Sequence, residues 1–413
     1  MTGTDPGATA DSGPARPLFP VVHIGNEGNL GNRMLRFLAG VRLAGLVPGC
    51  RLSGVSLPEW GIVLPDIPLG AGETLRLAAP DPDHGMALPL AALAARLRAG
   101  TLARVALTQY AQHLRNFPPR EVCAGLFPVG AAAPTITTGP GELLISIRGA
   151  EIFAAPHPDY TLVPIAFYQE LVAATGLVPV FLGQLDPNPY TAALRAAFPA
   201  ARFVAARTPM ADFAALRQAR HIVPSVSTFA WLAAWLGAAE QVFLPLTGFL
   251  NPCQHPAIDL LPLDDPRYRF YLFPFNVAVP PDGVAAAHRA MAGAWRLMPP
   301  EMLAELRRGR PRFRLGLAAM REMFDEGFYL ARYADVRAGI AAGWFRSGAD
   351  HYAHAGFAEG REPFRLDRAW YCRAYPIAAI EVGQGDFADL HHHYAAVGRD
   401  RLYCPTPPEG ASP

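Results

Sequence analysis

The stretch that decides the fold is Leu143-Leu-Ile-Ser-Ile-Arg-Gly-Ala-Glu-Ile152. It begins as an apolar run typical of a buried strand and ends in a polar cluster before helix-like sequence. A second stretch, Pro224-Ser-Val-Ser-Thr-Phe-Ala-Trp-Leu-Ala-Ala-Trp-Leu236, has the same order of strand, polar cluster and helix. We therefore expect a sheet whose strands end in an arginine at one place and in hydroxyls at another, which suits a diphosphate.

Strands and helices alternate on both sides of these stretches. Before them we expect a strand at 18–24, a Gly/Asn loop at 25–32 and helices at 33–46 and 88–97. From residue 142 onward we expect strands at 143–147, 178–182, 201–204, 222–226 and 242–244, with helices at 165–175, 190–198, from 212, and at 229–236. Such alternation predicts an α/β fold, a pair of Rossmann-like domains with parallel sheets and a cleft between them.

The last hundred or so residues follow a different pattern. Phe324-Asp-Glu-Gly-Phe-Tyr-Leu-Ala-Arg-Tyr333 recurs as Leu366-Asp-Arg-Ala-Trp-Tyr-Cys-Arg-Ala-Tyr375, an offset of 42 residues (324 to 366). The same offset relates His351-Tyr352 to His393-Tyr394, which predicts a small helical tandem repeat. We thus expect a disordered tail at 1–17, an acceptor-side domain at 18–135, a nucleotide-sugar-binding domain at 136–298, a basic linker helix at 299–322 and two repeats at 323–413.

Composition narrows the class of protein. The 36 basic residues are all arginines and nearly balance the 35 acidic residues, which argues against a nucleic-acid binder and excludes a lysine nucleophile. Five scattered cysteines fit reduced thiols in a cytosolic protein. The first seventeen residues lack the features of a signal peptide, and the charge-free run at 222–239 is interrupted by polar residues. We expect a cytoplasmic protein without a transmembrane segment, able to associate peripherally with the inner face of the membrane.

A glycine-rich loop precedes the first expected helix. Gly28, Asn29, Gly31 and Asn32 could let the backbone approach an anion beside a helix N-terminus, with side-chain donors added by the two asparagines. A tight turn with Asn caps explains the same residues equally well.

Arg148 ends the expected strand at 143–147. Its guanidinium could grip a β-phosphate and take up charge as the sugar–phosphate bond breaks. Alternatively it pairs with Glu151 or another acid at the sheet end. Glu151 is itself a candidate general base, and His157, in a loop shortly after Arg148, is a weaker candidate for meeting the acceptor.

Ser225, Ser227 and Thr228 lie where a strand turns into a helix, and they could form a second anion site or an ordinary N-cap. Trp231 and Trp235, four residues apart, are more typical of core than of a sugar platform. Asp212 could accept the edge of a guanine, although a helix N-terminal carboxylate needs no such role.

Metal binding is not expected. His391-His-His393 has no acid or cysteine at ligand spacing, so we interpret it as a solvated helix end. No D-x-D pair follows a strand, and Asp264-Asp265-Pro is typical of a turn. We expect a reaction without a metal or other cofactor.

Three stretches, in this order, resemble the α-1,2-fucosyltransferases and, more loosely, the wider fucosyltransferase superfamily. Gly28-Asn-Leu-Gly-Asn-Arg-Met34 is similar to the family's GGLGNQMF, and Ser146-Ile-Arg-Gly-Ala-Glu-Ile152 to its HxRRGDY. Asp212 together with residues 225–236 is similar to its D…SNSTFSWWAAWL. The resemblance implies a GT-B fold, GDP-fucose as donor, inversion and no metal. It places the diphosphate on Arg148 and on Ser225, Ser227 or Thr228, and Asp212 near the guanine.

The chain departs from the family at three motif positions, where Ser146, Gly149 and Glu151 replace His, Arg and Asp. Two hypotheses follow. In the first, the chain is an inverting glycosyltransferase that acts on a bacterial surface glycan, with Glu151, Glu27 or His157 as base. In the second, it is a catalytically degenerate glycan-binding or assembly protein. The aromatic side chains of its repeats would then form a binding surface: Tyr329, Tyr333, Tyr352, Trp370, Tyr371 and Tyr375.

Overall fold

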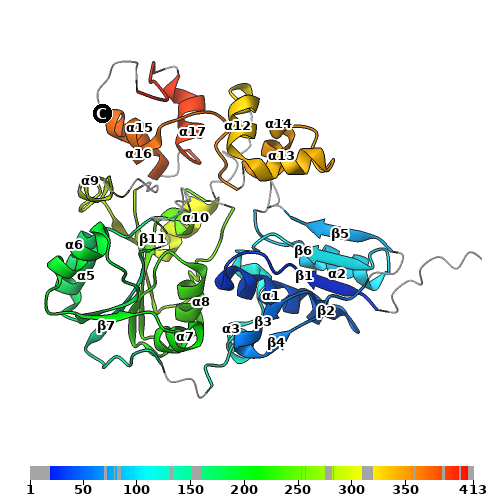
Figure 1. The fold of residues 1–413 in the computed structure, drawn as a ribbon, viewed down its shortest axis with the longest axis horizontal. Coiled ribbons are helices and arrows are strands. Elements are labelled where there is room, and N and C mark those ends of the chain that lie inside the picture. The colour runs from blue at the N-terminus through cyan, green and yellow to red at the C-terminus, as the bar shows by residue number, and fades with distance from the viewer. Residues whose placement is uncertain are drawn as a thin grey trace, which may run out of the picture.

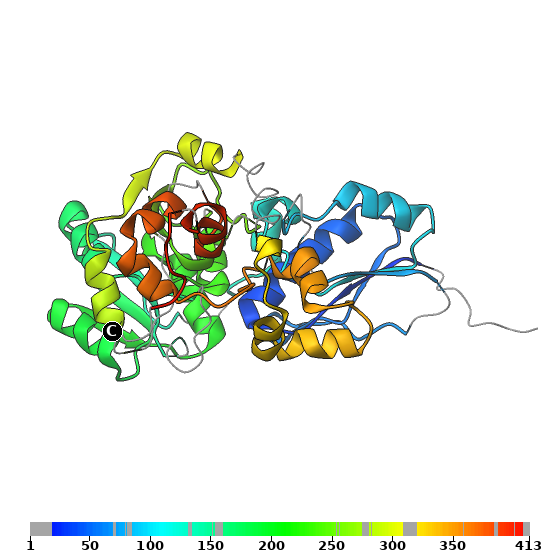
Figure 2. The ribbon, with the colours of Figure 1, turned by 90° about the horizontal axis from the view of Figure 1, so that it is seen from above.

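The structure is a computed structural model of the chain. It describes residues 19–68, 72–78, 80, 85–130, 134–150, 152, 160–252, 254–255, 257–274, 281, 283–308, 320–357, 359–383, 387–399 and 401–407. Two α/β units lie side by side, and the C-terminal helices lie along one side of both (Figures 1 and 2). The predicted α/β class with parallel sheets is confirmed, whereas the domain boundaries stay predictions, and the expected tail at 1–17 lies outside the described residues.

The first unit is built on a four-stranded parallel sheet in the order β2-β1-β6-β5. Its strands are β1 (Val21–Ile24), β2 (Arg51–Ser53), β5 (Thr74–Leu77) and β6 (Arg104–Leu107). Helices α1 (Leu30–Gly45), α2 (Leu90–Arg98) and α3 (Arg120–Leu126) accompany it, with a small antiparallel pair of β3 (Ser56–Leu57) and β4 (Ile62–Val63). Strands β1 and β6 are neighbours at the centre of this sheet.

The second unit has a seven-stranded sheet in the order β13-β12-β11-β10-β7-β8-β9, parallel except for β13. Its strands are β7 (Glu142–Arg148), β8 (Val178–Gln184), β9 (Arg202–Ala205), β10 (His221–Val223), β11 (Gln241–Leu246), β12 (Tyr268–Leu272) and β13 (Arg296–Met298). Counted from β7, the six parallel strands have the Rossmann order 3-2-1-4-5-6. Strands β8 and β9 are added on one side of β7, and strands β10 to β12 on the other. The switch point of the sheet therefore lies between β7 and β10, the two strands that the sequence singled out.

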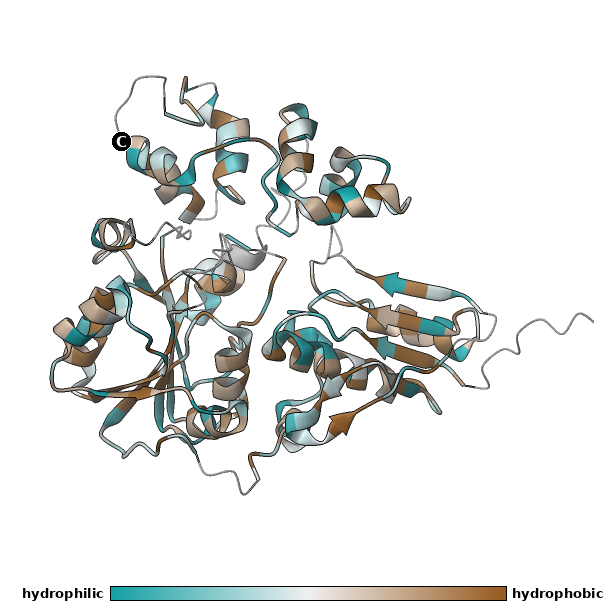
Figure 3. Cartoon of the chain, viewed as in Figure 1, coloured by the Kyte–Doolittle hydropathy of each residue, from teal (hydrophilic) through white to brown (hydrophobic). Residues whose placement is uncertain are grey.

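Helices cover both faces of the second sheet, as Figure 1 shows. They are α5 (Ile165–Thr175), α6 (Pro189–Ala197), α7 (Pro209–Gln218), α8 (Thr228–Leu236), α9 (Val284–Ala290) and α10 (Pro300–Arg308). The predicted helices at 165–175, 190–198 and 229–236 are thus confirmed to within a residue at each end. Hydrophobic residues are concentrated in the strands of both sheets (Figure 3). Helix α8 is buried all round, because it lies between the second sheet and the first unit.

The two units share one hydrophobic core. The Trp60 ring packs edge-on against Phe213 across the junction, with ring centroids 5.3 Å apart. The Leu114 N–H donates to the Asp259 carbonyl over 2.8 Å, so backbone hydrogen bonds also join the loop after β6 to the second unit. The expectation of a core role for Trp231 and Trp235 is confirmed, since both are buried and their rings stack 5.5 Å apart.

Equivalent contacts recur 42 residues apart in the C-terminal helices. These helices are α12 (Glu326–Arg332), α13 (Ala334–Ala341), α14 (Gly348–His351), α15 (Arg368–Ala374), α16 (Pro376–Gly383) and α17 (Leu390–His393), with π-helical turns at Tyr352–Gly356 and Tyr394–Gly398. The Tyr329 hydroxyl lies 2.9 Å from His351 Nδ1, and the Tyr371 hydroxyl lies 3.0 Å from His393 Nδ1. Tyr329, Tyr352 and Tyr371 are fully buried, so these three rings form core and not a binding surface.

The interpretation of His391-His-His393 as a solvated helix end is wrong. All three rings are buried, at 0%, 5% and 0% exposed. His391 Nε2 donates to the Phe364 carbonyl over 3.2 Å, and His393 Nε2 lies 2.9 Å from Glu381. The triplet fills the interior of this helical region because each imidazole finds a polar partner there.

Among the described residues, no helix combines the length and the apolar character that crossing a membrane requires.

Candidate functional site

The N-termini of helices α1 and α8 meet at Gly31. A Cβ atom on Gly31 would lie 2.5 Å from both the Phe229 amide nitrogen and the Thr228 hydroxyl oxygen. No real Cβ comes so close to such atoms, so this approach of two helix ends requires glycine. The glycine-rich loop of the first unit and the Ser/Thr cluster of the second are thereby brought together. Both helices point their positive dipole ends toward the junction.

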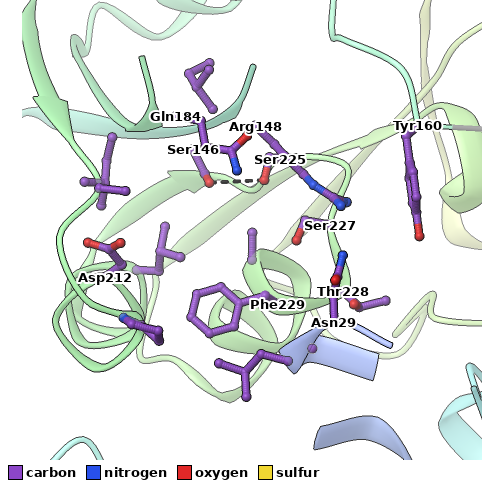
Figure 4. A pocket seen from close by; sticks show the side chains of 18 of the residues that line it. Asn29, Ser146, Arg148, Tyr160, Gln184, Asp212, Ser225, Ser227, Thr228 and Phe229 are labelled. Carbon is purple, nitrogen blue, oxygen red and sulfur yellow. Dashed lines mark hydrogen bonds between the residues drawn. The ribbon is translucent and has the colours of Figure 1, made fainter. Parts of the chain in front are cut away.

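A cavity of about 450 Å³ opens at this junction (Figure 4), within the size range of small-molecule sites. It is lined by the carboxyl ends of β7 and β8, the start of α1 and the starts of α7 and α8. The lining residues include most of those predicted from the sequence: Asn29, Gly31, Asn32, Arg148, Asp212, Ser225, Ser227 and Thr228. The cavity thus lies outside the carboxyl ends of the strands, at the switch point of the second sheet.

Two hydroxyls bridge that switch point. Ser146 Oγ, on β7, donates a hydrogen bond to Ser225 Oγ, just beyond β10, over 3.2 Å. Ser227 occupies the N-cap position of α8, but its side chain makes no capping bond. The capping interpretation of this residue is therefore incomplete, because its hydroxyl does not satisfy the helix end. Ser225, Ser227 and Thr228 present hydroxyls and the α8 N-terminus to the same space (Figure 4).

Arg148 is the cationic side chain at the end of β7, and its side chain extends toward the start of α8 and Asn29 (Figure 4). Its guanidinium carbon lies 4.5 Å from the centroid of the Tyr160 ring, a cation–π arrangement. Gln184, at the end of β8, accepts a hydrogen bond from the Ala150 N–H over 3.1 Å and holds the chain after Arg148 in place.

Asp212 lines the side of the cavity away from Tyr160 (Figure 4). The N-cap of α7 is Thr208, whose side chain accepts from the Ala211 N–H, and Asp212 is a carboxylate in the first turn of this helix, as its sequence position indicated. The Asp212 carboxylate accepts from the Arg207 N–H, 3.2 Å from each of its oxygens, and from the Thr135 hydroxyl. These bonds fix the carboxylate toward the ligand space.

The predicted residues of the glycine-rich loop either line the cavity or form the turn that precedes it. Gly28 has a positive φ of 86° and lies against Tyr110, outside the cavity lining. Asn32 accepts a hydrogen bond from Gln112 Nε2 over 3.1 Å, whereas Asn29 is the N-cap residue of α1 without a side-chain capping bond. Asn29 and Asn32 both line the cavity, and the positive φ of Gly28 reflects a turn that only glycine adopts readily.

Buried Arg36 anchors the same loop. It donates to the backbone carbonyls of Gly25 and Glu27, the latter over 2.7 Å, and lies 3.2 Å from the Glu27 carboxylate. Burial lowers the pKa of Arg36, and the charge of Glu27 acts in the opposite direction. Arg36 was not anticipated, because a single arginine inside an apolar helix pattern carries no local signal of its contacts.

Two predicted site residues, Glu151 and His157, lie outside the described residues. Four residues that line the cavity, Tyr160, Gln184, Arg207 and Phe229, were not predicted as part of the site. Gln184 could have been predicted from its position at the end of β8, because the carboxyl ends of parallel strands lie at the same edge of a sheet. The described residues contain no cluster of three or more His, Cys, Asp or Glu side chains arranged as a metal site.

We compared the chain with protein families, curated proteins and solved structures. No protein-family model matches it, and no curated protein matches it. Among solved structures, the E. coli heptosyltransferase WaaC with ADP is similar at 13% identity and a TM-score of 0.31. That alignment covers 55% of this chain and 87% of the heptosyltransferase.

Proposed function

We propose that the chain is an inverting, metal-independent glycosyltransferase that moves a sugar to a hydroxyl of a bacterial surface glycan, with GDP-fucose as donor. One observation carries the proposal. Residues of three stretches far apart in the sequence, 28–34, 146–152 and 212–236, line one cavity at the junction of two Rossmann-like units. These are the same stretches that resemble the fucosyltransferases.

The cavity is polarised to bind a diphosphate. The N-termini of α1 and α8 converge on it, and both supply unpaired N–H groups with a positive dipole. Arg148 adds a full positive charge able to bind two phosphate oxygens at once. The Ser225, Ser227 and Thr228 hydroxyls add neutral donors. This concentration of hydrogen-bond donors and positive charge favours an anionic ligand over an uncharged sugar alone.

The same groups would act during transfer. An acceptor hydroxyl attacks the anomeric carbon, the bond from that carbon to the β-phosphate oxygen breaks, and the nucleoside diphosphate leaves with the electron pair. Negative charge on the leaving oxygen grows as the bond breaks, so Arg148 and the two helix ends bind the transition state more tightly than the ground state. The candidate bases are Glu151, Glu27 and His157.

The base of the nucleotide is proposed to lie toward Asp212. Its carboxylate is held by Arg207 and Thr135, and guanine presents adjacent N1–H and N2–H₂ donors that a carboxylate can accept. Leu182, Pro209 and Leu216 give this side of the cavity apolar walls against which a purine could pack.

The test is calorimetric binding of GDP, UDP and ADP, followed by turnover of GDP-fucose. Arg148→Ala should abolish GDP binding and lower turnover by about 10²–10³-fold. Arg202→Ala is the matched control, because Arg202 lies at the opposite, amino end of the same sheet, paired with Glu142 over 2.6 Å. Preference for UDP or ADP would change the donor. GDP binding without turnover would favour the degenerate binder, and no nucleotide binding would refute the proposal.

A further inference from the structure

Tyr110 lies in a strained loop at the carboxyl end of β6, a central strand of the first sheet. The loop follows β6, and Ala111 within it has a φ of 53°, in the left-handed region that alanine rarely adopts. Ala111 is fully buried, whereas the neighbouring Tyr110 is 40% exposed. The strained turn thus buries Ala111 and leaves the Tyr110 ring partly exposed.

Arg36 supports this ring from below. The guanidinium carbon of Arg36 lies 5.4 Å from the centroid of the Tyr110 ring, and a Cβ atom on Gly28 would lie 3.1 Å from the Tyr110 Cε1 atom. The same guanidinium holds the Glu27 carboxylate at 3.2 Å, while the Glu27 side chain stays 70% exposed. One buried cation therefore fixes both an exposed aromatic ring and an exposed carboxylate, and brings them together on the surface.

Both groups adjoin the proposed donor cavity. Glu27 is two residues before Asn29, which lines the cavity. Gln112, two residues after Tyr110, donates to Asn32, which also lines it. The loops that follow the neighbouring strands β1 and β6 therefore both lead to residues that line the cavity or bond to its lining.

We propose that Tyr110 and Glu27 form the binding subsite for the acceptor sugar, with Glu27 as the general base. This inference rests on the proposed transferase function. An aromatic ring offers an apolar face to the C–H groups of a pyranose, and a nearby carboxylate accepts hydrogen bonds from its hydroxyls. Of the three candidate bases, Glu27 is the one that lies within the described residues, two positions before Asn29 of the cavity lining.

The proposed transfer forms one bond, breaks one bond and moves one proton. The acceptor oxygen forms a bond to the anomeric carbon as the bond from that carbon to the β-phosphate breaks. The proton of the acceptor hydroxyl passes to the Glu27 carboxylate, and the electron pair of the broken bond leaves with GDP. Arg36 contacts neither sugar, so it acts as a positioning residue for Glu27 and Tyr110.

The experiment uses the full chain, with methyl glycosides of galactose, glucose, mannose and N-acetylglucosamine as acceptor probes. Saturation-transfer NMR measures their binding in the presence of GDP, and GDP release from GDP-fucose measures transfer. We expect at least one glycoside to bind the wild type. Tyr110→Ala should remove the NMR signal of that glycoside and raise the acceptor KM about tenfold. Tyr110→Phe should leave the signal and the KM unchanged. Glu27→Gln should lower kcat for transfer about 10²–10⁴-fold while GDP affinity stays unchanged.

Glu73→Gln is the matched control, because Glu73 is another exposed glutamate of the same unit, paired with Arg96 over 2.7 Å. It should change neither binding nor kcat. Failure of the wild type to bind any of GDP, UDP and ADP would defeat the transferase proposal itself. GDP binding without any glycoside signal, or full transfer activity in Glu27→Gln, would overturn only the subsite. Unchanged GDP affinity in the variants shows that they are folded.

Discussion

The hydroxyl of Ser146 donates a hydrogen bond to the hydroxyl of Ser225 across 3.2 Å, and this bond joins β7 to the segment after β10 where the strand order reverses. Because the Ser225 oxygen accepts this bond, its own proton is left to donate in another direction. Both side chains line the cavity, and they are otherwise buried. Ser225 is therefore oriented to donate to an anion, and Ser146 is its support.

This polarity predicts unequal effects of removing the two hydroxyls. Ser225→Ala should weaken GDP binding by about 1.5–3 kcal/mol, because it removes a donor to a charged group. Ser146→Ala should cost about 0.5–1.5 kcal/mol, because it removes only the bond that orients Ser225. Calorimetric titration of both variants with GDP gives the comparison. An equal or larger loss in Ser146→Ala would show that the bond runs in the other direction or that Ser146 binds the ligand itself.

The second prediction concerns the approach of α1 to α8. Gly31→Ala would place a methyl group 2.5 Å from the Phe229 nitrogen and the Thr228 hydroxyl, so the two helix ends must move apart. We expect a loss of about 1–3 kcal/mol in unfolding free energy and a GDP affinity at least tenfold lower. Gly45→Ala, at the exposed end of the same helix with no atom within 4 Å, should be neutral or stabilising by up to about 1 kcal/mol. Similar behaviour of the two variants in thermal melting and titration would contradict the close approach.

The sequence predicted the second sheet better than the first. Strand β7 and helices α5 and α8 were found almost to the residue, because long apolar runs there end in clear polar or glycine signals. Strand β5, Thr74–Leu77, was missed because its Thr-Leu-Arg-Leu alternation is short and lies among proline-rich turns. A strand at such a sheet edge is fixed by its pairing with β6 and not by its own composition.

Site residues were predicted where the neighbouring sequence identifies them and missed where their role depends on a contact across the fold. Arg148 and Ser225 were found because Arg148 ends one apolar strand and Ser225 lies two residues beyond another. Tyr160 and Arg36 were not found as parts of the site, because each matters through a contact made across the fold, with Arg148 and with the Gly25–Glu27 loop respectively. The burial of His391-His-His393 was missed for a related reason. Three consecutive histidines resemble a surface run until the packing against Phe364 and Glu381 is known.

The third prediction tests the equivalence of the two C-terminal helical segments. A Cβ on Gly356 would collide with the Tyr329 hydroxyl, and a Cβ on Gly398 would collide with the Tyr371 hydroxyl. Gly356→Ala and Gly398→Ala should therefore each disrupt a Tyr–His hydrogen bond and cost about 1–3 kcal/mol. Gly327→Ala, exposed on α12 with only an ordinary contact to Asp325, serves as the control and should be nearly neutral. Hydrogen exchange of the local amides measures each effect, and a loss in only one segment would argue against equivalent packing.

The fourth prediction concerns acid stability around His391. Complete burial, with the nearby charge of Arg368 as a smaller cause, lowers the pKa of His391 to about 3, whereas in the unfolded chain it is about 6.5. Between these values the unfolded state binds one more proton than the folded state, so stability falls as the pH falls below about 6.5. From pH 7.5 to pH 5 this residue alone should cost about 2 kcal/mol, because the slope approaches about 1.4 kcal/mol per pH unit below pH 6.5. His391→Gln keeps an N–H donor for the Phe364 carbonyl but cannot titrate. Hydrogen exchange of the α17 amides at pH 7.5 and pH 5, corrected for intrinsic exchange rates, should therefore show a smaller acid-induced loss in the variant, even if the variant is less stable at pH 7.5. An equal loss in both proteins would mean that His391 does not titrate as its burial requires.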